Sequence, residues 1–310
     1  MLFRQLEYLV SLSRERHFAR AAKACFVSQP ALSEAIRKLE EEFDVPLVRR
    51  GRRFEGLTPE GERIVMWAQR ILADRDALWH EIGALHTGLS GELRIGSVPT
   101  ASAAVALIAE PFCAEHPLVR IQIISDLRAD DVLGRLNNFE LDAGITYLDD
   151  AVTANFRSVP LYEERYVLLT RETPGRASTS GVTWADASRL PLCMLSAVMQ
   201  GRRVLDAVFA EVGVQAQPQV ETDSVASLFA HVRTGRWASI IPRAWLHVFG
   251  IPQGMRAVPL VEPTRTARIG LVVTAREPGS VLARTFADIA RRTDVNAALD
   301  HLPESSIPSQ

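Results

Sequence analysis

Residues 26–43 have the sequence FVSQPALSEAIRKLEEEF, which predicts a helix over about 29–42. Ser28 suits the N-cap, and Pro30 falls in the first turn, where its missing N–H costs nothing. At about 100° per residue the apolar side chains gather in one stripe. The stripe that we expect to be buried consists of Leu32, Ile36, Leu39 and Phe43.

The opposite face of this helix is small, polar and partly basic. It carries Pro30, Ser33, Glu34 and Arg37, and such a face can enter the major groove of DNA without steric clashes. Apolar spacing predicts two shorter helices before it, over 3–13 and 18–25. This order is typical of a helix-turn-helix. The alternative is a plain three-helix unit whose polar face is merely solvated.

The next residues predict a β-hairpin wing. Segments 47–50 and 54–57 suit short strands, with a turn centred on Gly51 between them. The wing holds four arginines, namely Arg49, Arg50, Arg52 and Arg53. Arginines on such a tip suit contacts with phosphates or the minor groove. A solvated charge cluster is the alternative. It is less favoured because the candidate recognition helix, about 29–42, comes directly before the wing.

A long helix is predicted to follow, from Thr58-Pro59-Glu60 to about His86, because these residues supply an N-cap, a first-turn proline and an acid. Its heptad-like seam has one polar interruption, and its members are Ile71, Arg75, Leu78, Ile82, Leu85 and Leu89. A partner helix from a second subunit would cover this seam. The alternative is packing on the C-terminal part of the same chain.

These ordered motifs resemble the LysR-type transcriptional regulators. The resemblance is dense over residues 1 to about 88 and is carried by Phe18–Ala22, Val27–Ser33, Ile36–Glu40, Val45–Leu47 and Leu57–Gly61. The chain departs from the family in a more arginine-rich wing and in Glu60, where alanine is frequent. The resemblance implies DNA contacts by Ser28, Gln29, Pro30, Ser33, Arg37, Arg50, Arg52 and Arg53. It also implies that 59–88 dimerises, with a tetramer built of two dimers.

Strand and helix patterns alternate after a short hinge at 88–91. A βαβαβ series over about 92–146 predicts a parallel sheet. We therefore expect an α/β chain with three parts: a winged helix-turn-helix at 1–58, a linker helix at 59–88, and a periplasmic-binding-protein-like domain at 91–302. Its lobe I would comprise about 91–161 and 268–302, and its lobe II about 162–267.

Ligands of such sheets bind beyond the carboxyl ends of the strands. The candidates for effector contacts there are Thr100, Ser102, Thr146, Ser196, Met199, Asp223 and Ser224. Hydroxyls beside helix N-termini favour a compact anion between the lobes. For Ser102 and Ser224, simple helix capping is an equal alternative.

Bulk features exclude other classes. The 310 residues carry a net charge of −2, and no apolar run reaches the roughly 18 residues that span a bilayer. The N-terminus does not read as a secretory signal, so we expect a cytoplasmic protein. Three scattered cysteines, Cys25, Cys113 and Cys193, indicate neither a disulfide framework nor a zinc site.

Hydrolase, phosphate-loop, metal and dinucleotide motifs do not occur, so we expect no enzyme and no cofactor. The expected partners are a roughly palindromic duplex DNA site, a small-molecule co-inducer, further copies of the chain and RNA polymerase. Two alternatives stay open: a small-molecule-binding protein without a genetic role, and a DNA-architectural protein with a vestigial sensor. Salt-dependent binding of duplex DNA would exclude the first, and identification of a ligand would exclude the second.

Overall fold

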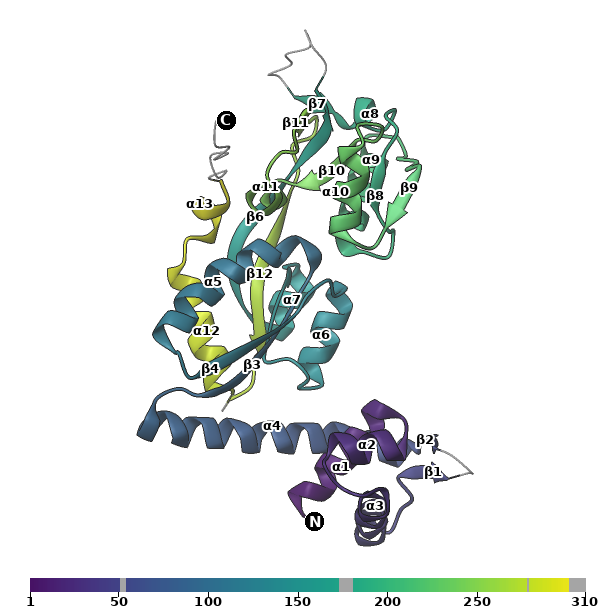
Figure 1. Cartoon of the computed structure of the whole chain (residues 1–310), viewed down its shortest axis with the longest axis vertical. Helices are drawn as coiled ribbons and strands as arrows, with labels where there is room; N and C mark the ends of the chain where they lie inside the picture. Colours follow the sequence, from purple (N-terminus) through teal and green to yellow (C-terminus); the bar gives the residue numbers. More distant parts are fainter. Residues whose placement is uncertain (51–53, 173–180, 278, 301–310) are drawn as a thin grey trace. The chain divides into compact units, whose positions relative to one another are not determined.

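The structure is a computed structural model that describes residues 1–50, 54–172, 181–277 and 279–300. It divides into two compact units, the first formed mainly by Met1–Gly88 and the second beginning at Leu89 (Figure 1). None of the helices in these described ranges is long and apolar enough to cross a membrane.

The first unit is a small helical domain with a hairpin. Its elements are α1 (Phe3–Glu15), α2 (Phe18–Ala24), α3 (Gln29–Phe43), β1 (Val48–Arg50), β2 (Phe54–Leu57) and α4 (Pro59–Thr87). The core forms where the apolar stripes of α1 and α3 meet Val65 and Ala68 of α4. As predicted, Leu32, Ile36 and Leu39 are fully buried. The assignment of Phe43 to the buried stripe is wrong, because Phe43 ends α3 beyond this core and is 41% exposed.

Backbone contacts fix the hairpin against the helices. Glu40 of α3 accepts hydrogen bonds from the backbone N–H groups of Leu47 and Val48, at 2.9 and 3.2 Å. Thr58 caps α4 by accepting from the N–H of Gly61 at 2.9 Å. A Cβ atom on Gly61 would collide with the carbonyl oxygen of Leu47, so only glycine permits this approach. The hairpin is thereby held at the C-terminal end of α3.

The second unit contains a mixed sheet with the order β4-β3-β5-β12-β6-β11-β7, in which β10 also pairs with β6. Strands β8 and β9 form a separate two-stranded sheet. The strands of the unit are β3 (Gly91–Ser97), β4 (Val119–Ile124), β5 (Ala143–Tyr147), β6 (Phe156–Arg171), β7 (Val182–Thr183), β8 (Cys193–Leu195), β9 (Val220–Thr222), β10 (Ser239–Pro242), β11 (Met255–Val261) and β12 (Thr266–Thr274). Its helices are the 3-10 turn η1 (Pro99–Ala101), α5 (Ser102–Glu115), α6 (Ala129–Asn137), α7 (Asp150–Asn155), α8 (Trp184–Ala187), α9 (Gln200–Glu211), α10 (Val225–Arg233), α11 (Ala244–Phe249), α12 (Val281–Arg292) and α13 (Val295–Asp300).

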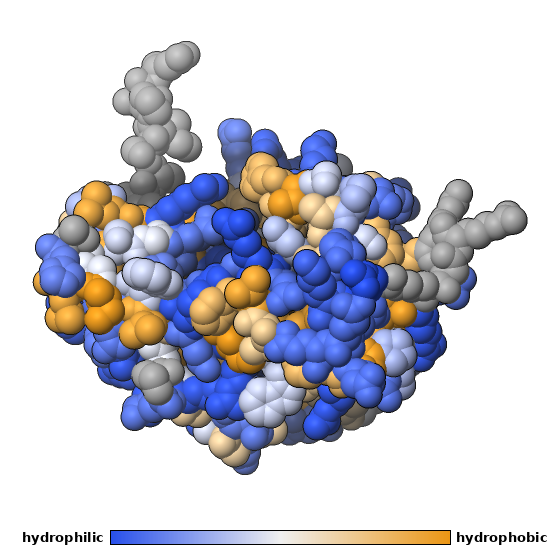
Figure 2. Space-filling view, turned by 90° about the horizontal axis from the view of Figure 1, so that it is seen from below, coloured by the Kyte–Doolittle hydropathy of each residue, from blue (hydrophilic) through white to orange (hydrophobic). Residues whose placement is uncertain are grey.

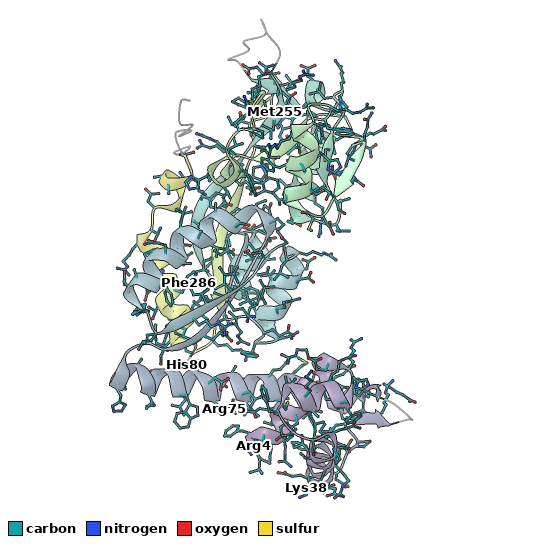
Figure 3. All side chains as sticks on the ribbon, in the orientation of Figure 1. Arg4, Lys38, Arg75, His80, Met255 and Phe286 are labelled. Carbon is teal, nitrogen blue, oxygen red and sulfur yellow. The ribbon has the colours of Figure 1, made fainter. Side chains whose placement is uncertain are left out.

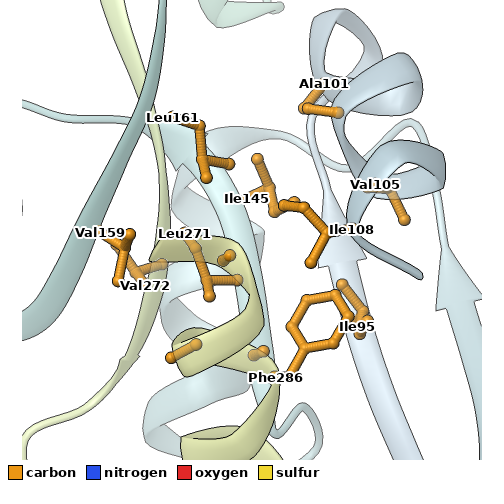
Figure 4. Packing of buried hydrophobic residues seen from close by; sticks show 14 of the residues in the cluster. Ile95, Ala101, Val105, Ile108, Ile145, Val159, Leu161, Leu271, Val272 and Phe286 are labelled. Carbon is orange, nitrogen blue, oxygen red and sulfur yellow. The ribbon is translucent and has the colours of Figure 1, made fainter. Parts of the chain in front are cut away.

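Lobe I is built on β3, β4 and β5, which pair in parallel as predicted. Helices α5 and α12 pack together on this sheet, and the rings of Phe112 and Phe286 meet edge to face at 5.3 Å. Figure 4 shows Phe286 beside Ile95 and Ile108 in this core. Strand β12 returns to lobe I and pairs antiparallel with β5, so the predicted return is confirmed and the sheet is mixed.

Lobe II has two cores of its own. One surrounds Trp184 and Phe209, and the other surrounds Phe229 and Trp245. The side chains that fill lobe II around Met255 are visible in Figure 3. These cores are distinct from the lobe I core, so the second unit consists of two separately packed lobes.

Strand β6 connects the two lobes without a break. Its first half pairs with β12 and its second half pairs with β10 and β11. Glu164 lies opposite Ala267 of β12, and Tyr166, two residues later, lies opposite Pro242 of β10. The change of partner therefore falls at 164–166. The predicted α/β architecture, with a winged helix-turn-helix, a long helix and a two-lobed domain, is confirmed.

Candidate DNA interface and effector site

The outer face of α3 is the candidate surface for base contacts. Ser28 caps the helix, its side chain accepting from the N–H of Ala31 at 3.4 Å. Gln29 and Pro30 are exposed and Ser33 is half-buried. These side chains start from one turn at the N-terminus of a rigid helix, which is the arrangement that groove recognition requires.

Arg37 belongs to the same face but is engaged within the helix. It is half exposed, its Nη2 lies 2.7 Å from Glu34 Oε1, and it also contacts Glu41. Hydrogen bonds and charge from the two glutamates raise the pKa of Arg37, and the hydrogen bond from Arg37 lowers the pKa of Glu34. Ion pairs this open to solvent contribute little to stability. Breaking these ion pairs to let Arg37 contact a phosphate would therefore cost little stability.

The wing is only partly within the described ranges. Strand β1 ends at Arg50, paired with β2, while Arg52 and Arg53 lie outside the described residues. Their predicted DNA contacts stay predictions.

Helix α4 presents apolar side chains to solvent along one stripe. Trp67, Leu78 and Leu85 are 55%, 60% and 77% exposed, and Ile82 is also exposed. Figure 2 shows hydrophobic side chains among hydrophilic ones on the surface of the molecule. Arg75, the polar interruption of the seam, contacts Glu7 of α1, with 2.5 Å between Nη1 and Oε1. This intramolecular pair explains why the heptad pattern breaks there.

A hollow separates the two lobes at the carboxyl ends of β3 and β5. Lobe I contributes Val98, Pro99, Thr100, Leu127, Ala129 and Tyr147, and lobe II contributes Leu195, Met199, Gln200 and Gly201. We call it the interlobe hollow. In this structure it has room for only about one water molecule.

Two helices begin at this hollow, one from each lobe. Helix α5 starts after Ala101 and α9 after Met199, and neither N-cap residue makes a side-chain capping hydrogen bond. Side chains therefore leave both ends uncapped, and on the lobe I side this end is that of the 3-10 turn η1, from which α5 continues directly. Gly201 approaches lobe I closely, because a Cβ atom there would lie 3.0 Å from the hydroxyl of Tyr147.

Two of the predicted effector residues, Thr100 and Met199, line the interlobe hollow. The others do not. Ser102 is exposed and donates to the carbonyl of Pro99, Ser196 is half-buried, and Asp223 is exposed. Thr146 is fully buried, and Ser224 caps α10. These remaining assignments stay predictions, and for Ser224 the structure displays the capping alternative.

A buried polar cluster, which sequence reasoning missed, adjoins the hollow. Glu164 is 1% exposed, and its Oε1 accepts from the hydroxyl of Tyr166 at 2.6 Å and from that of Tyr147 at 3.3 Å. Thr100 Oγ1 lies 3.5 Å from the Tyr147 hydroxyl, and Tyr162 donates to the carbonyl of Thr100 at 3.1 Å. Burial raises the pKa of Glu164 to about 7, against an opposing contribution from its hydrogen bonds.

Comparisons with known proteins agree with this organisation. The family described as "Bacterial regulatory helix-turn-helix protein, lysR family" matches residues 3–62, and "LysR substrate binding domain" matches residues 86–294. The DNA-binding transcriptional dual regulator OxyR of Escherichia coli is 30% identical over 301 residues, covering 94% of both chains. The hydrogen peroxide-inducible genes activator of Haemophilus influenzae is 28% identical, covering 97% of this chain and all of its own.

Solved structures show the same fold. A cysteine variant of full-length OxyR from Pseudomonas aeruginosa has a TM-score of 0.75 at 25% identity, covering 96% of this chain and 97% of that one. Full-length CbnR in complex with its target DNA has a TM-score of 0.65 at 20% identity, covering 94% and 100%.

Proposed function

Because the chain belongs to the LysR family of DNA-binding transcriptional regulators, and is not an enzyme, we propose that a compact anionic effector in the interlobe hollow controls its activity on DNA. The observation that carries this proposal is the meeting of two helix N-termini, those of α5 and α9, at one hollow. Neither end is capped by a side chain, and each carries the positive end of a helix dipole, so an anion bound there would hold both lobes at once.

The lining supports an acceptor-rich ligand of small size. Thr100 and Tyr147 offer hydroxyls, while most other lining residues are apolar. Ligand pockets usually enclose about 300–1,000 Å³, whereas the hollow in this structure has room for only about one water molecule. Even a compact carboxylate would therefore require the lobes to separate.

The test compares two threonine variants with the same chemistry. Thr100→Val removes a hydroxyl that lines the hollow, whereas Thr146→Val removes one buried outside its lining. Calorimetry with a panel of small carboxylates and sulfate measures anion binding, and a gel-shift assay measures DNA binding. We expect Thr100→Val alone to lose anion binding by about tenfold or more, with DNA affinity retained. Equal anion binding by both variants would place the effector elsewhere.

For DNA, we propose that Ser28, Gln29, Pro30, Ser33 and Arg37 of the recognition helix, with Arg50, Arg52 and Arg53 of the wing, contact the duplex. Replacing Arg52 and Arg53 should weaken binding to all sequences and reduce the salt slope by about one for each phosphate that is no longer neutralised. Replacing Gln29 or Ser33 should instead change discrimination between sites. A uniform decrease in affinity with both kinds of variant would contradict the base-reading assignment.

We also propose that α4 dimerises the chain and that two dimers form a tetramer on a roughly palindromic site. The uncovered stripe containing Leu78 and Leu85 supports the helix contact. Two helix-turn-helix units related by a two-fold axis would read two half-sites. We further propose that the protein acts in the cytoplasm and that RNA polymerase is one of its partners.

Peroxide sensing is the second candidate, since several relatives are named hydrogen peroxide-inducible activators. A peroxide-reactive cysteine must be accessible and readily ionised. Cys193 is fully buried in β8, and burial raises the pKa of its thiol. Cys113 of α5 is exposed. If peroxide changes DNA binding and Cys113→Ser or Cys193→Ser abolishes the change, this candidate replaces the anion proposal.

A further inference from the structure

Glu164 lies where the chain passes from one lobe to the other. Tyr147 and Tyr162 belong to the lobe I core, and Tyr166 belongs to a lobe II core. The Oε1 atom of Glu164 accepts hydrogen bonds from both sides, from Tyr147 and from Tyr166. Its Oε2 atom is buried without a hydrogen-bond partner among the described residues. One carboxyl group therefore links the two lobes and keeps one oxygen unused.

The hydroxyl of Tyr147 stands between this carboxyl and the interlobe hollow. Tyr147 lines the hollow, and its hydroxyl donates to Glu164 at 3.3 Å in the structure. A hydroxyl has one proton to donate. Tyr147 can therefore donate either to Glu164 or to an anion in the hollow, but not fully to both.

The ionisation of Glu164 decides between these two arrangements. An ionised Glu164 has no proton of its own and competes with the anion for the one on Tyr147. A protonated Glu164 can donate to the Tyr147 oxygen, which frees the Tyr147 proton for the anion. The chain of donation then runs from Glu164 through Tyr147 to the ligand.

The surroundings of Glu164 offer little positive charge to offset a second negative one. Tyr162 and Tyr166 flank it on β6, Tyr147 faces it from β5, and Thr100 faces it from η1. Arg243 borders the same small pocket at the crossover but lies 3.2 Å from Asp300. The remaining charged residues that border this pocket are the exposed Glu163 and Arg165.

We propose that the effector anion enters the interlobe hollow together with one proton, which is taken from water and resides on Glu164. This inference rests on the proposed function. The proton adds to the Glu164 carboxylate when the anion binds and returns to water when the anion leaves, so the complex gains no net charge. Effector response would then depend on pH as well as on effector concentration.

The size of the effect follows from the geometry. A carboxylate two hydrogen bonds away, at about 6 Å, would weaken anion binding by about 100-fold at an effective dielectric constant of about 20. Since the pKa of Glu164 is about 7, affinity for the anion should fall by up to tenfold per pH unit above neutrality. The affinity should stop falling at the pH above which the anion binds mainly to protein with an ionised Glu164.

The experiment uses the full-length protein and a panel of acetate, succinate, benzoate and sulfate. Calorimetry of the tightest-binding member, in buffers of different ionisation enthalpy at about pH 7.5, gives the number of protons taken up per anion bound. The variants are Glu164→Gln and its exposed neighbour Glu163→Gln, which alters the same chemistry on the other face of β6. Thr100→Val reports whether the probe occupies the hollow.

Uptake of about 0.7 proton in the wild type and in Glu163→Gln, with none in Glu164→Gln, is the expected result, because about a quarter of free Glu164 is already protonated at this pH. Glu164→Gln should also bind with a Kd that no longer rises with pH. Binding that needs Thr100 but takes up no proton would overturn this inference and leave the proposed function standing. If no panel member binds, or if Thr100→Val binds normally, the proposed function fails and this inference fails with it.

Discussion

Replacing Glu164 by glutamine should remove a pH dependence of stability that the wild-type protein carries. The pKa of this carboxyl is about 7 in the folded chain, compared with 4.5 when unperturbed. Because the folded value is the higher one, the native state binds more protons than the unfolded state between about pH 4.5 and about pH 7. Native stability must therefore fall as the pH rises through this window.

The magnitude follows from the two pKa values. A difference of about 2.5 pH units, at about 1.4 kcal/mol per unit, corresponds to a loss of up to about 3 kcal/mol by pH 8. Glutamine keeps a carbonyl oxygen for the hydroxyls of Tyr147 and Tyr166 and cannot ionise. We expect the variant to match the wild type near pH 5 and to exceed its stability near pH 8.

Urea unfolding of the full-length protein measures this difference. Tryptophan fluorescence follows unfolding, because one of the five tryptophans, Trp184, is fully buried beside Tyr166 with 6.4 Å between ring centroids, in the lobe that holds one of the Glu164 partners. Glu163→Gln is the matched control and should keep the wild-type pH dependence. Parallel stability curves for wild type and Glu164→Gln from pH 5 to pH 8 would refute the reasoning.

Three further variants test the other surfaces. Leu78→Glu places a charge in the exposed stripe of α4 and should raise the dissociation constant of the dimer on the order of 100-fold, as measured by light scattering. An unchanged dimer would show that the stripe is not an interface. Gly201→Ala puts a methyl group 3.0 Å from the Tyr147 hydroxyl and should weaken anion binding about tenfold while sparing DNA binding, which calorimetry and gel shift would separate. Ser28→Ala removes the cap of α3 and should lower the free energy of unfolding of the DNA-binding unit by about 1 kcal/mol; no change in urea unfolding would contradict the capping role.

The DNA-binding unit is predictable from the sequence because its signals are local. The N-cap at Ser28, the first-turn proline and the apolar period of α3 all act within a few residues. Helix α4 is predictable for the same reason, and it ends at Thr87. Phe43 is the exception. The helical period correctly places it on the apolar stripe, but how far the core reaches along α3 depends on the other helices and cannot be read from nearby residues.

The crossover strand is only partly predictable. The apolar run in residues 165–170, RYVLLT, predicts a strand by itself, whereas β6 runs from Phe156 to Arg171. Residues 163–165 are all charged, which is typical of a loop, and only pairing with β12 makes them a strand. The alternation of Tyr162, Glu164 and Tyr166 does contain a signal, because every second residue shares one face. Nothing local, however, indicates that a glutamate on that face is buried.

The geometry of the hollow also constrains how an effector can act. A ligand shifts a two-state equilibrium only through its different affinity for the two states, and a shift from about 1:99 to about 99:1 needs about 5.5 kcal/mol. One helix N-terminus contributes at most about 2 kcal/mol to an anion, and a hydrogen bond to a charged group about 1.5–3 kcal/mol.

On these figures lobe I alone could supply about 5–8 kcal/mol, so the total binding energy is not what limits the shift. The α5 terminus with the hydroxyls of Thr100 and Tyr147 lies on lobe I, and the α9 terminus lies on lobe II. Only contacts made to lobe I and lobe II together distinguish one state of closure from another, because contacts to one lobe are the same in both. An effector that works must therefore contact both lobes at once, and this requirement sets a minimum length for the effector.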